Sequence, residues 1–177
     1  MVNAGYEIPR WGGPLNNTAF GKRFFGGWEV SGIGLAQSGS VFSITDSTGA
    51  AYYGVTTSTA SWAPGATVST ADLSGSVGGR LNKYFNTADF VKAGNLFGNA
   101  GRNILRGPGQ RNVDFALTKT IPVTERFRAQ FRSEFFNVMN LVNFSTPSGS
   151  FTSSSFGKIT ATTGNPRVIQ LALKLTF

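Results

Sequence analysis

The chain has 177 residues and a formal net charge of +8, and it contains neither cysteine nor histidine. The missing cysteine excludes disulfides and thiolate metal sites, and the missing histidine removes the commonest general base and metal ligand. The basic residues lie at alternate strand positions or in glycine-rich loops and form no helical stripe, which argues against nucleic-acid binding. We therefore expect no enzyme activity, no catalytic residue, no metal site, no cofactor and no nucleic-acid partner.

Glycine and aromatic residues are abundant, with 23 Gly, 16 Phe, 4 Tyr and 3 Trp, which favours an all-β fold. Alternation of apolar and polar residues predicts about five strands, at 2–8, 28–45, 112–121, 126–137 and 167–177. A short turn at 122–125 joins the third strand to the fourth. The segments 46–110 and 138–166 lack sustained periodicity and are predicted to be long loops with small local elements.

The last two strands carry the clearest alternation. In the fourth strand, Phe127, Phe131 and Phe135 occupy one side, and the opposite side is long and polar. Strands of about ten residues with one apolar and one polar face are typical of the wall of a membrane β-barrel with a polar lumen. The candidates for lumen-facing side chains are Arg128, Gln130, Arg132, Glu134, Gln170 and Lys174. They would tune passage, hold a plug by salt bridges, or simply solvate the lumen.

Two other interpretations of this pattern stay open. A soluble β-sandwich with one solvated face, binding an acidic partner, would show the same alternation. The basic segment GRNILRGPG at 101–109 is either a tight turn or a contact for an anionic ligand through Arg102 and Arg106.

Four longer motifs follow one another from Gly26 onward. They are GGWEVSGIGLAQSGSVFSI, YFNTADF, FGNAGRNILRGPGQRNVDFALTKTIPVTERFRAQFRSEFFNVMNLVNF and FGKITATTGNPRVIQLALKLTF. Together they resemble the C-terminal barrel segment of Oar-like TonB-dependent receptors of Gram-negative bacteria, which open with a carboxypeptidase-regulatory-like domain. The resemblance implies a place in the cell outer membrane and a barrel of about 22 strands around a plug, which imports a ligand with energy delivered by TonB.

The resemblance also implies partners. They are outer-membrane lipid, the rest of the barrel and the plug domain, the TonB system through a more N-terminal region, and the barrel-assembly machinery. That machinery would read a signal in the last strand, formed by Ile169, Leu171, Leu173, Leu175 and Phe177. About five strands are fewer than the roughly eight of the smallest membrane barrels, so we expect an incomplete barrel fragment. The alternative function is a structural or adhesive outer-membrane barrel that binds surfaces or glycans through its loops.

Overall fold

The computed structural model describes residues 1–9, 18, 21, 24–48, 52 and 54–177. The chain divides into two compact units, each formed by segments that are distant in sequence. The first unit consists of Met1–Gln37, Arg111–Val142 and Gly164–Phe177. The second consists of Ser38–Gln110 and Asn143–Thr163.

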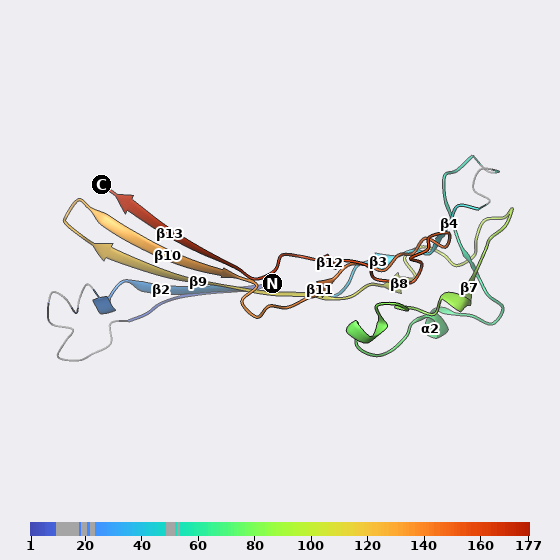
Figure 1. Cartoon of the computed structure of the whole chain (residues 1–177), viewed down its shortest axis with the longest axis horizontal. Coiled ribbons are helices and arrows are strands. Elements are labelled where there is room, and N and C mark those ends of the chain that lie inside the picture. Colours follow the sequence, from blue (N-terminus) through green and yellow to red (C-terminus); the bar gives the residue numbers. More distant parts are fainter. Residues whose placement is uncertain (10–17, 19–20, 22–23, 49–51, 53) are drawn as a thin grey trace. The chain divides into compact units, whose positions relative to one another are not determined.

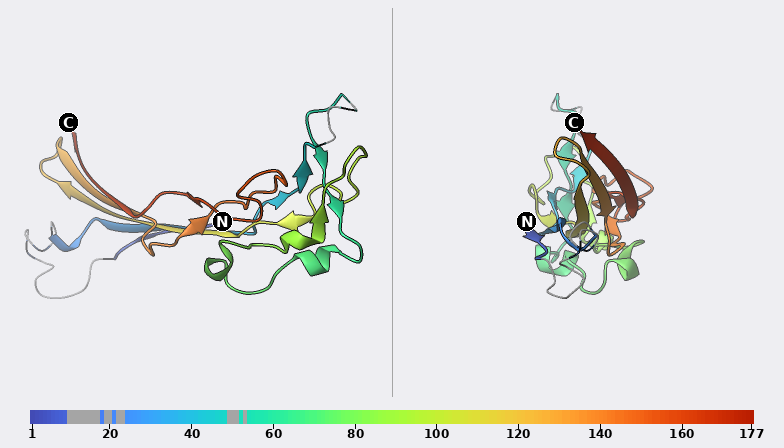
Figure 2. Two further views of the ribbon diagram at one scale, coloured as in Figure 1. Left: turned by 45° about the vertical axis from the view of Figure 1, so that its right-hand side comes forward. Right: turned by 90° about the vertical axis from the view of Figure 1, so that its left-hand side faces the viewer.

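The first unit is built on a five-stranded sheet with the order β1-β2-β9-β10-β13 (Figure 1). Its strands are β1 (Val2–Glu7), β2 (Trp28–Gln37), β9 (Gln110–Pro122), β10 (Arg128–Phe136) and β13 (Val168–Thr176). The pairs β1 with β2, β9 with β10 and β10 with β13 are antiparallel. Figure 2 shows these strands side by side with a common twist, as expected for L-residues in a sheet. The antiparallel all-β fold predicted from the alternation is confirmed.

Most strand ends lie within two residues of the predicted ones, but the second strand is shorter than expected. Alternation suggested a strand over 28–45, whereas β2 ends at Gln37. After Gln37 the chain leaves the five-stranded sheet, and its next strand, β3 (Val41–Phe42), pairs with β8 (Leu105–Arg106). The alternation of apolar and polar residues continues past Gln37 and therefore does not reveal that β2 ends there.

The two ends of the five-stranded sheet differ. At one end β9 and β10 are joined by a tight turn, in which the amides of Val123 and Thr124 both donate to the carbonyl of Phe127, at 2.9 and 3.1 Å. Gly27 lies beside Thr120 and Gly32 lies beside Asp114, so β2 runs antiparallel to β9. At the opposite end of the sheet, β2 and β10 therefore end, and β9 and β13 begin. Both long insertions, 38–110 and 143–163, therefore leave the sheet from the same end.

In the second unit, the residues that the structure describes form only short elements. They are β3, β4 (Thr45–Asp46), β5 (Ser58–Thr59), β6 (Ser61–Trp62), α2 (Val68–Ala71), η3 (Gly78–Arg80), η4 (Thr87–Asp89), β7 (Phe90–Val91), β8, β11 (Asn143–Phe144) and β12 (Thr162–Thr163). Four antiparallel pairs join β3 to β8, β4 to β5, β6 to β7, and β11 to β12. No helix in the described part of the chain is long and apolar enough to cross a membrane.

An aromatic core holds the second unit together. Phe85 is 1% exposed and packs edge-on against Phe90 and Phe156, with ring centroids 5.7 and 5.3 Å away. Ile44 and Ala60 are fully buried beside it. The predicted loops 46–110 and 138–166 contain small elements, and most of their residues belong to this second unit. Residues 49–51 and 53 of the first loop lie outside the described residues.

Candidate functional site

The polar side of the five-stranded sheet gathers the six side chains predicted to face a lumen. These are Arg128, Gln130, Arg132 and Glu134 on β10, and Gln170 and Lys174 on β13. Residues directly opposite each other in a sheet share a face. Gln130 lies opposite Lys174, and Glu134 lies opposite Gln170. The two arginines of β10 share this face because side chains alternate along a strand. The structure therefore brings all six together.

Charge on this face is mixed, with a cationic excess. The guanidinium of Arg132 lies 3.1 Å from a carboxylate oxygen of Glu134, and these side chains are 54% and 22% exposed. An ion pair exposed to this extent contributes little to stability. On β9, Thr118 and Thr120 lie opposite Arg132 and Gln130 and extend the polar face. The arrangement forms a polar face that is shared by β9, β10 and β13.

The other face of the same strands is apolar. Phe135 on β10 lies opposite Phe115 on β9 and opposite Ile169 on β13. The ring centroids of Phe115 and Phe135 are 6.0 Å apart. Leu171 and Leu173 on β13 are 64% and 69% exposed. An exposed apolar face of this kind is typical of contact with lipid or with a protein partner. It includes four of the residues predicted to form an assembly signal, Ile169, Leu171, Leu173 and Leu175, and Phe177 follows the strand with its ring centroid 6.1 Å from that of Phe127.

Lys119 interrupts the apolar row of β9, and the sequence alone did not explain it. In the structure Lys119 is 5% exposed. Its partner on β10 is Phe131, which belongs to the apolar face. Its ammonium donates to the carbonyl oxygens of Phe24, at 2.9 Å, and of Gly26, and it lies 5.0 Å from the ring centroid of Trp28. The charge is thus covered by carbonyl dipoles and an aromatic face. The Phe-Phe-Gly-Gly-Trp stretch that leads into β2 is a local sequence signal for this arrangement.

Asn137, at the end of β10, was also missed. It is 5% exposed and has a positive φ of 50°, which Asn tolerates better than most residues. Its amide nitrogen donates to the carbonyls of Leu141 and Asn165, at 3.0 and 3.1 Å, and its amide oxygen accepts from the Leu141 N–H at 2.8 Å. Its own N–H donates to a carboxylate oxygen of Asp114 at 2.9 Å. This one side chain therefore joins the end of β10 to the segment leading into β13.

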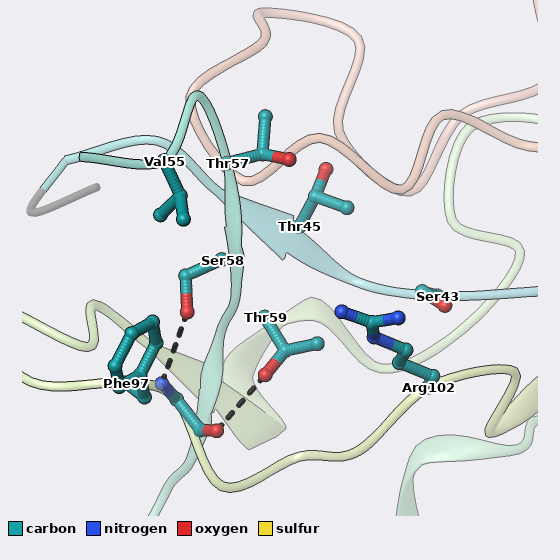
Figure 3. Close-up of a pocket in the computed structure, with 9 residues that line it drawn as sticks. Ser43, Thr45, Val55, Thr57, Ser58, Thr59, Phe97 and Arg102 are labelled. Atoms are coloured by element: carbon teal, nitrogen blue, oxygen red, sulfur yellow. Dashed lines mark hydrogen bonds between the residues drawn. The ribbon is translucent and has the colours of Figure 1, made fainter. Parts of the chain in front are cut away.

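The second unit contains an open pocket of about 340 Å³ (Figure 3). Its lining comes from four stretches of chain and consists of Ser43, Thr45, Val55, Thr57, Ser58, Thr59, Phe97, Gly98 and Arg102. The structure places Arg102, a predicted ligand contact, in this lining. Arg106, the other predicted contact, lies outside it, and its guanidinium donates to the Gly39 carbonyl at 2.8 Å and the Ser38 hydroxyl at 3.2 Å. Arg106 therefore joins β8 to the start of the second unit.

The floor of the pocket is held by backbone contacts of Gly98. Its N–H donates to the Ser58 hydroxyl at 3.3 Å, and its carbonyl accepts from the Thr59 hydroxyl at 2.9 Å (Figure 3). A Cβ at this position would overlap the Thr59 carbonyl. Only glycine therefore allows this close approach of the two segments.

A buried carboxylate fixes the strand that carries Thr45. Asp46 is 1% exposed and accepts hydrogen bonds from the Thr48 N–H at 2.9 Å and the Ala93 N–H at 3.0 Å. Burial opposes the charged form, but the hydrogen bonds from Thr48 and Ala93, with the nearby charge of Lys92, outweigh it and hold the pKa of Asp46 below its usual value. Asp46 is therefore a structural anion at neutral pH. It links β4 to the chain after β7.

No group of three or more His, Cys, Asp or Glu side chains that could hold a metal ion occurs among the described residues. Comparison with protein families gives a match over residues 1–170 to a model described as an outer membrane beta barrel domain. No curated protein and no solved structure matches the chain. The family match covers nearly the whole chain and includes both units.

Proposed function

Because the chain belongs to the outer membrane beta barrel domain family, we propose that it forms part of the wall and outer loops of a TonB-dependent receptor. Such a receptor imports a ligand across the outer membrane with energy delivered by TonB. Outer-membrane localisation follows from the family itself. The apolar face of β9, β10 and β13 then meets lipid, and the polar face with Arg132 and Glu134 meets the lumen or a plug. We propose no enzymatic role for the chain.

The observation that carries this proposal is a sheet with one apolar face and two open edges. In the described part of the chain, β1 and β13 each have a strand neighbour on one side only. Unpaired backbone N–H and C=O groups are too costly to leave in lipid, so membrane sheets close into barrels. Five strands are fewer than the roughly eight of the smallest membrane barrels. The sheet therefore needs further strands, which we assign to other parts of a receptor chain.

The same proposal gives partners to the two faces. Outer-membrane lipid contacts the apolar row, and the barrel-assembly machinery reads the part of that row on β13, from Ile169 to Phe177. The TonB system acts through a region that precedes the barrel, as in the receptors that the sequence resembles. A plug domain would lie against the polar face, where Arg128, Arg132 and Lys174 supply positive charge.

Cross-linking to TonB tests the proposal. The outer-membrane polypeptide that contains this chain would be isolated from its own cells after treatment with a short amine-reactive cross-linker. We expect a cross-linked product with TonB that disappears when the TonB gene is deleted. A polypeptide that is assembled in the outer membrane but yields no such product would contradict transport and support the structural or adhesive alternative.

Protease accessibility tests the orientation. We propose that the turn between β9 and β10 faces the periplasm and that the two insertions, 38–110 and 143–163, face outward. Protease added to intact cells should cut within the insertions, because both leave the same end of the sheet. The turn Val123–Phe127 should be cut only after the outer membrane is permeabilised. Cleavage of the turn in intact cells, with the insertions protected, would reverse the orientation. Mass spectrometry of the released peptides locates the cuts.

A further inference from the structure

The pocket around Arg102 is rich in hydrogen-bond donors. Among the described residues, the Arg102 guanidinium has no hydrogen-bond partner, so its N–H groups are available to a ligand. The Ser43 hydroxyl accepts from the Asn103 N–H at 2.8 Å, and the Ser58 hydroxyl accepts from the Gly98 N–H at 3.3 Å. Each of these hydroxyls therefore keeps its own O–H to donate. Donors that converge with a cation favour an anionic ligand.

The rest of the lining suits a polyhydroxylated ring. Thr45 and Thr57 present hydroxyls that have no partner among the described residues, and a hydroxyl can both donate and accept. Phe97 is 59% exposed and Val55 is 39% exposed, and together they form an apolar wall of the pocket. Figure 3 shows Phe97 and Arg102 on opposite sides of the row of hydroxyls. A volume of about 340 Å³ lies near the lower end of the range for small-molecule sites.

We propose that this pocket binds a sugar acid the size of one ring. The carboxylate would pair with the Arg102 guanidinium, which can donate two parallel hydrogen bonds to it. The ring hydroxyls would exchange hydrogen bonds with Ser43, Ser58 and the threonines. The apolar C–H face of the ring would lie toward Phe97. The proposal rests on the receptor function proposed above, for which it names the class of ligand.

Binding of sodium D-glucuronate to the full barrel-containing polypeptide in detergent micelles tests the proposal. Isothermal titration calorimetry would compare glucuronate with D-glucose, which has the same ring but no charge, and with acetate, which has the charge but no ring. We expect glucuronate to bind at least about tenfold more tightly than either. That factor is what one charge-assisted hydrogen-bonded group commonly contributes. Equal affinity for glucose would overturn the role of the charge, and equal affinity for acetate would overturn the role of the ring.

Two matched substitutions locate the site. Arg102→Gln should weaken glucuronate binding at least about tenfold and leave glucose binding unchanged. Lys83→Gln removes the same charge from an exposed position outside the pocket lining, and it should leave both affinities unchanged. Arg102→Lys keeps the charge without the paired donors and should give an intermediate affinity. Equal effects of Arg102→Gln and Lys83→Gln would overturn the site. Near-ultraviolet circular dichroism of the aromatic core checks that each variant is folded.

The two proposals can fail separately. The cross-link to TonB does not depend on whether the pocket is occupied, and calorimetry in detergent does not depend on TonB. A polypeptide that cross-links to TonB but does not bind glucuronate would overturn the ligand proposal alone. Glucuronate binding without a TonB cross-link would overturn transport and keep the pocket as a glycan-binding site.

Discussion

Leu171→Arg is expected to destabilise the assembled barrel strongly, whereas Gln170→Arg is expected to be tolerated. The two residues are neighbours on β13 and project to opposite faces. Leu171 lies one residue from the middle of the strand, so its replacement puts a guanidinium near the centre of the bilayer, at a cost of roughly 2–4 kcal/mol. Gln170 lies opposite Glu134 on the polar face, where an added arginine meets water and a carboxylate.

Heat-modifiable gel mobility and urea unfolding in lipid vesicles would measure both variants of the full barrel-containing polypeptide. This pair is a cleaner comparison than a change at Phe131. Phe131 lies opposite Lys119 in the sheet, so an arginine there would add repulsion between like charges to the cost of entering lipid. If Leu171→Arg and Gln170→Arg had the same free energy of unfolding, the face with Leu171 and Leu173 would not contact lipid.

The strands of the sheet were predictable from the sequence because the pattern that specifies each of them lies within a short stretch of chain. In β10 and β13 the side chains alternate with a period of two over nine residues each, and every second residue shares a face. The register then follows from placing the apolar residues on one side, since a slip by one residue would exchange the faces. This is why the sequence alone could place the six polar candidates on β10 and β13 on one face of the sheet. Whether their face lines a lumen stays a prediction.

The second unit was not predictable by the same reasoning. Its strands are two residues long, too short to show any period. Its core depends on contacts between residues far apart in sequence, such as Phe85 with Phe156. The pocket likewise joins Ser43, Ser58 and Arg102 from separate stretches of chain. The sequence did indicate Arg102 through its glycine-rich context, but nothing local distinguished it from Arg106, which is held by Gly39.

Lys119 and Asn137 show a second limit of sequence patterns. Lys119 looked like a break in the apolar row, because the pattern records the charge but not the carbonyls of Phe24 and Gly26 that receive it. Asn137 was predicted to be the last residue of the fourth strand, and the pattern does not show that its three side-chain hydrogen bonds go to Leu141 and Asn165. In both cases a polar side chain supports the end of a strand through backbone groups that no periodicity reveals.

Asn137→Ala is expected to be among the most destabilising single changes in the first unit, and Asn140 provides its matched control. Both residues have a positive φ, of 50° and 51°, so alanine at either position costs about 1 kcal/mol in backbone strain. Asn137 alone is buried and bonded through its side chain. Asn140 is exposed, and its side chain has no hydrogen bond to any described residue.

The difference between the two variants therefore measures the hydrogen bonds. Three bonds lost from a buried side chain should cost roughly 2–4 kcal/mol beyond the strain, so Asn137→Ala should reduce the free energy of unfolding by that much more than Asn140→Ala. Asn137→Gly relieves the backbone strain but still lacks the three side-chain hydrogen bonds. Its free energy of unfolding should therefore exceed that of Asn137→Ala by only about 1 kcal/mol. Urea unfolding of the barrel in lipid vesicles would measure all three variants. Equal losses for Asn137→Ala and Asn140→Ala would mean that the bonds to Leu141 and Asn165 contribute nothing, and that β10 and β13 are held together by their ladder alone.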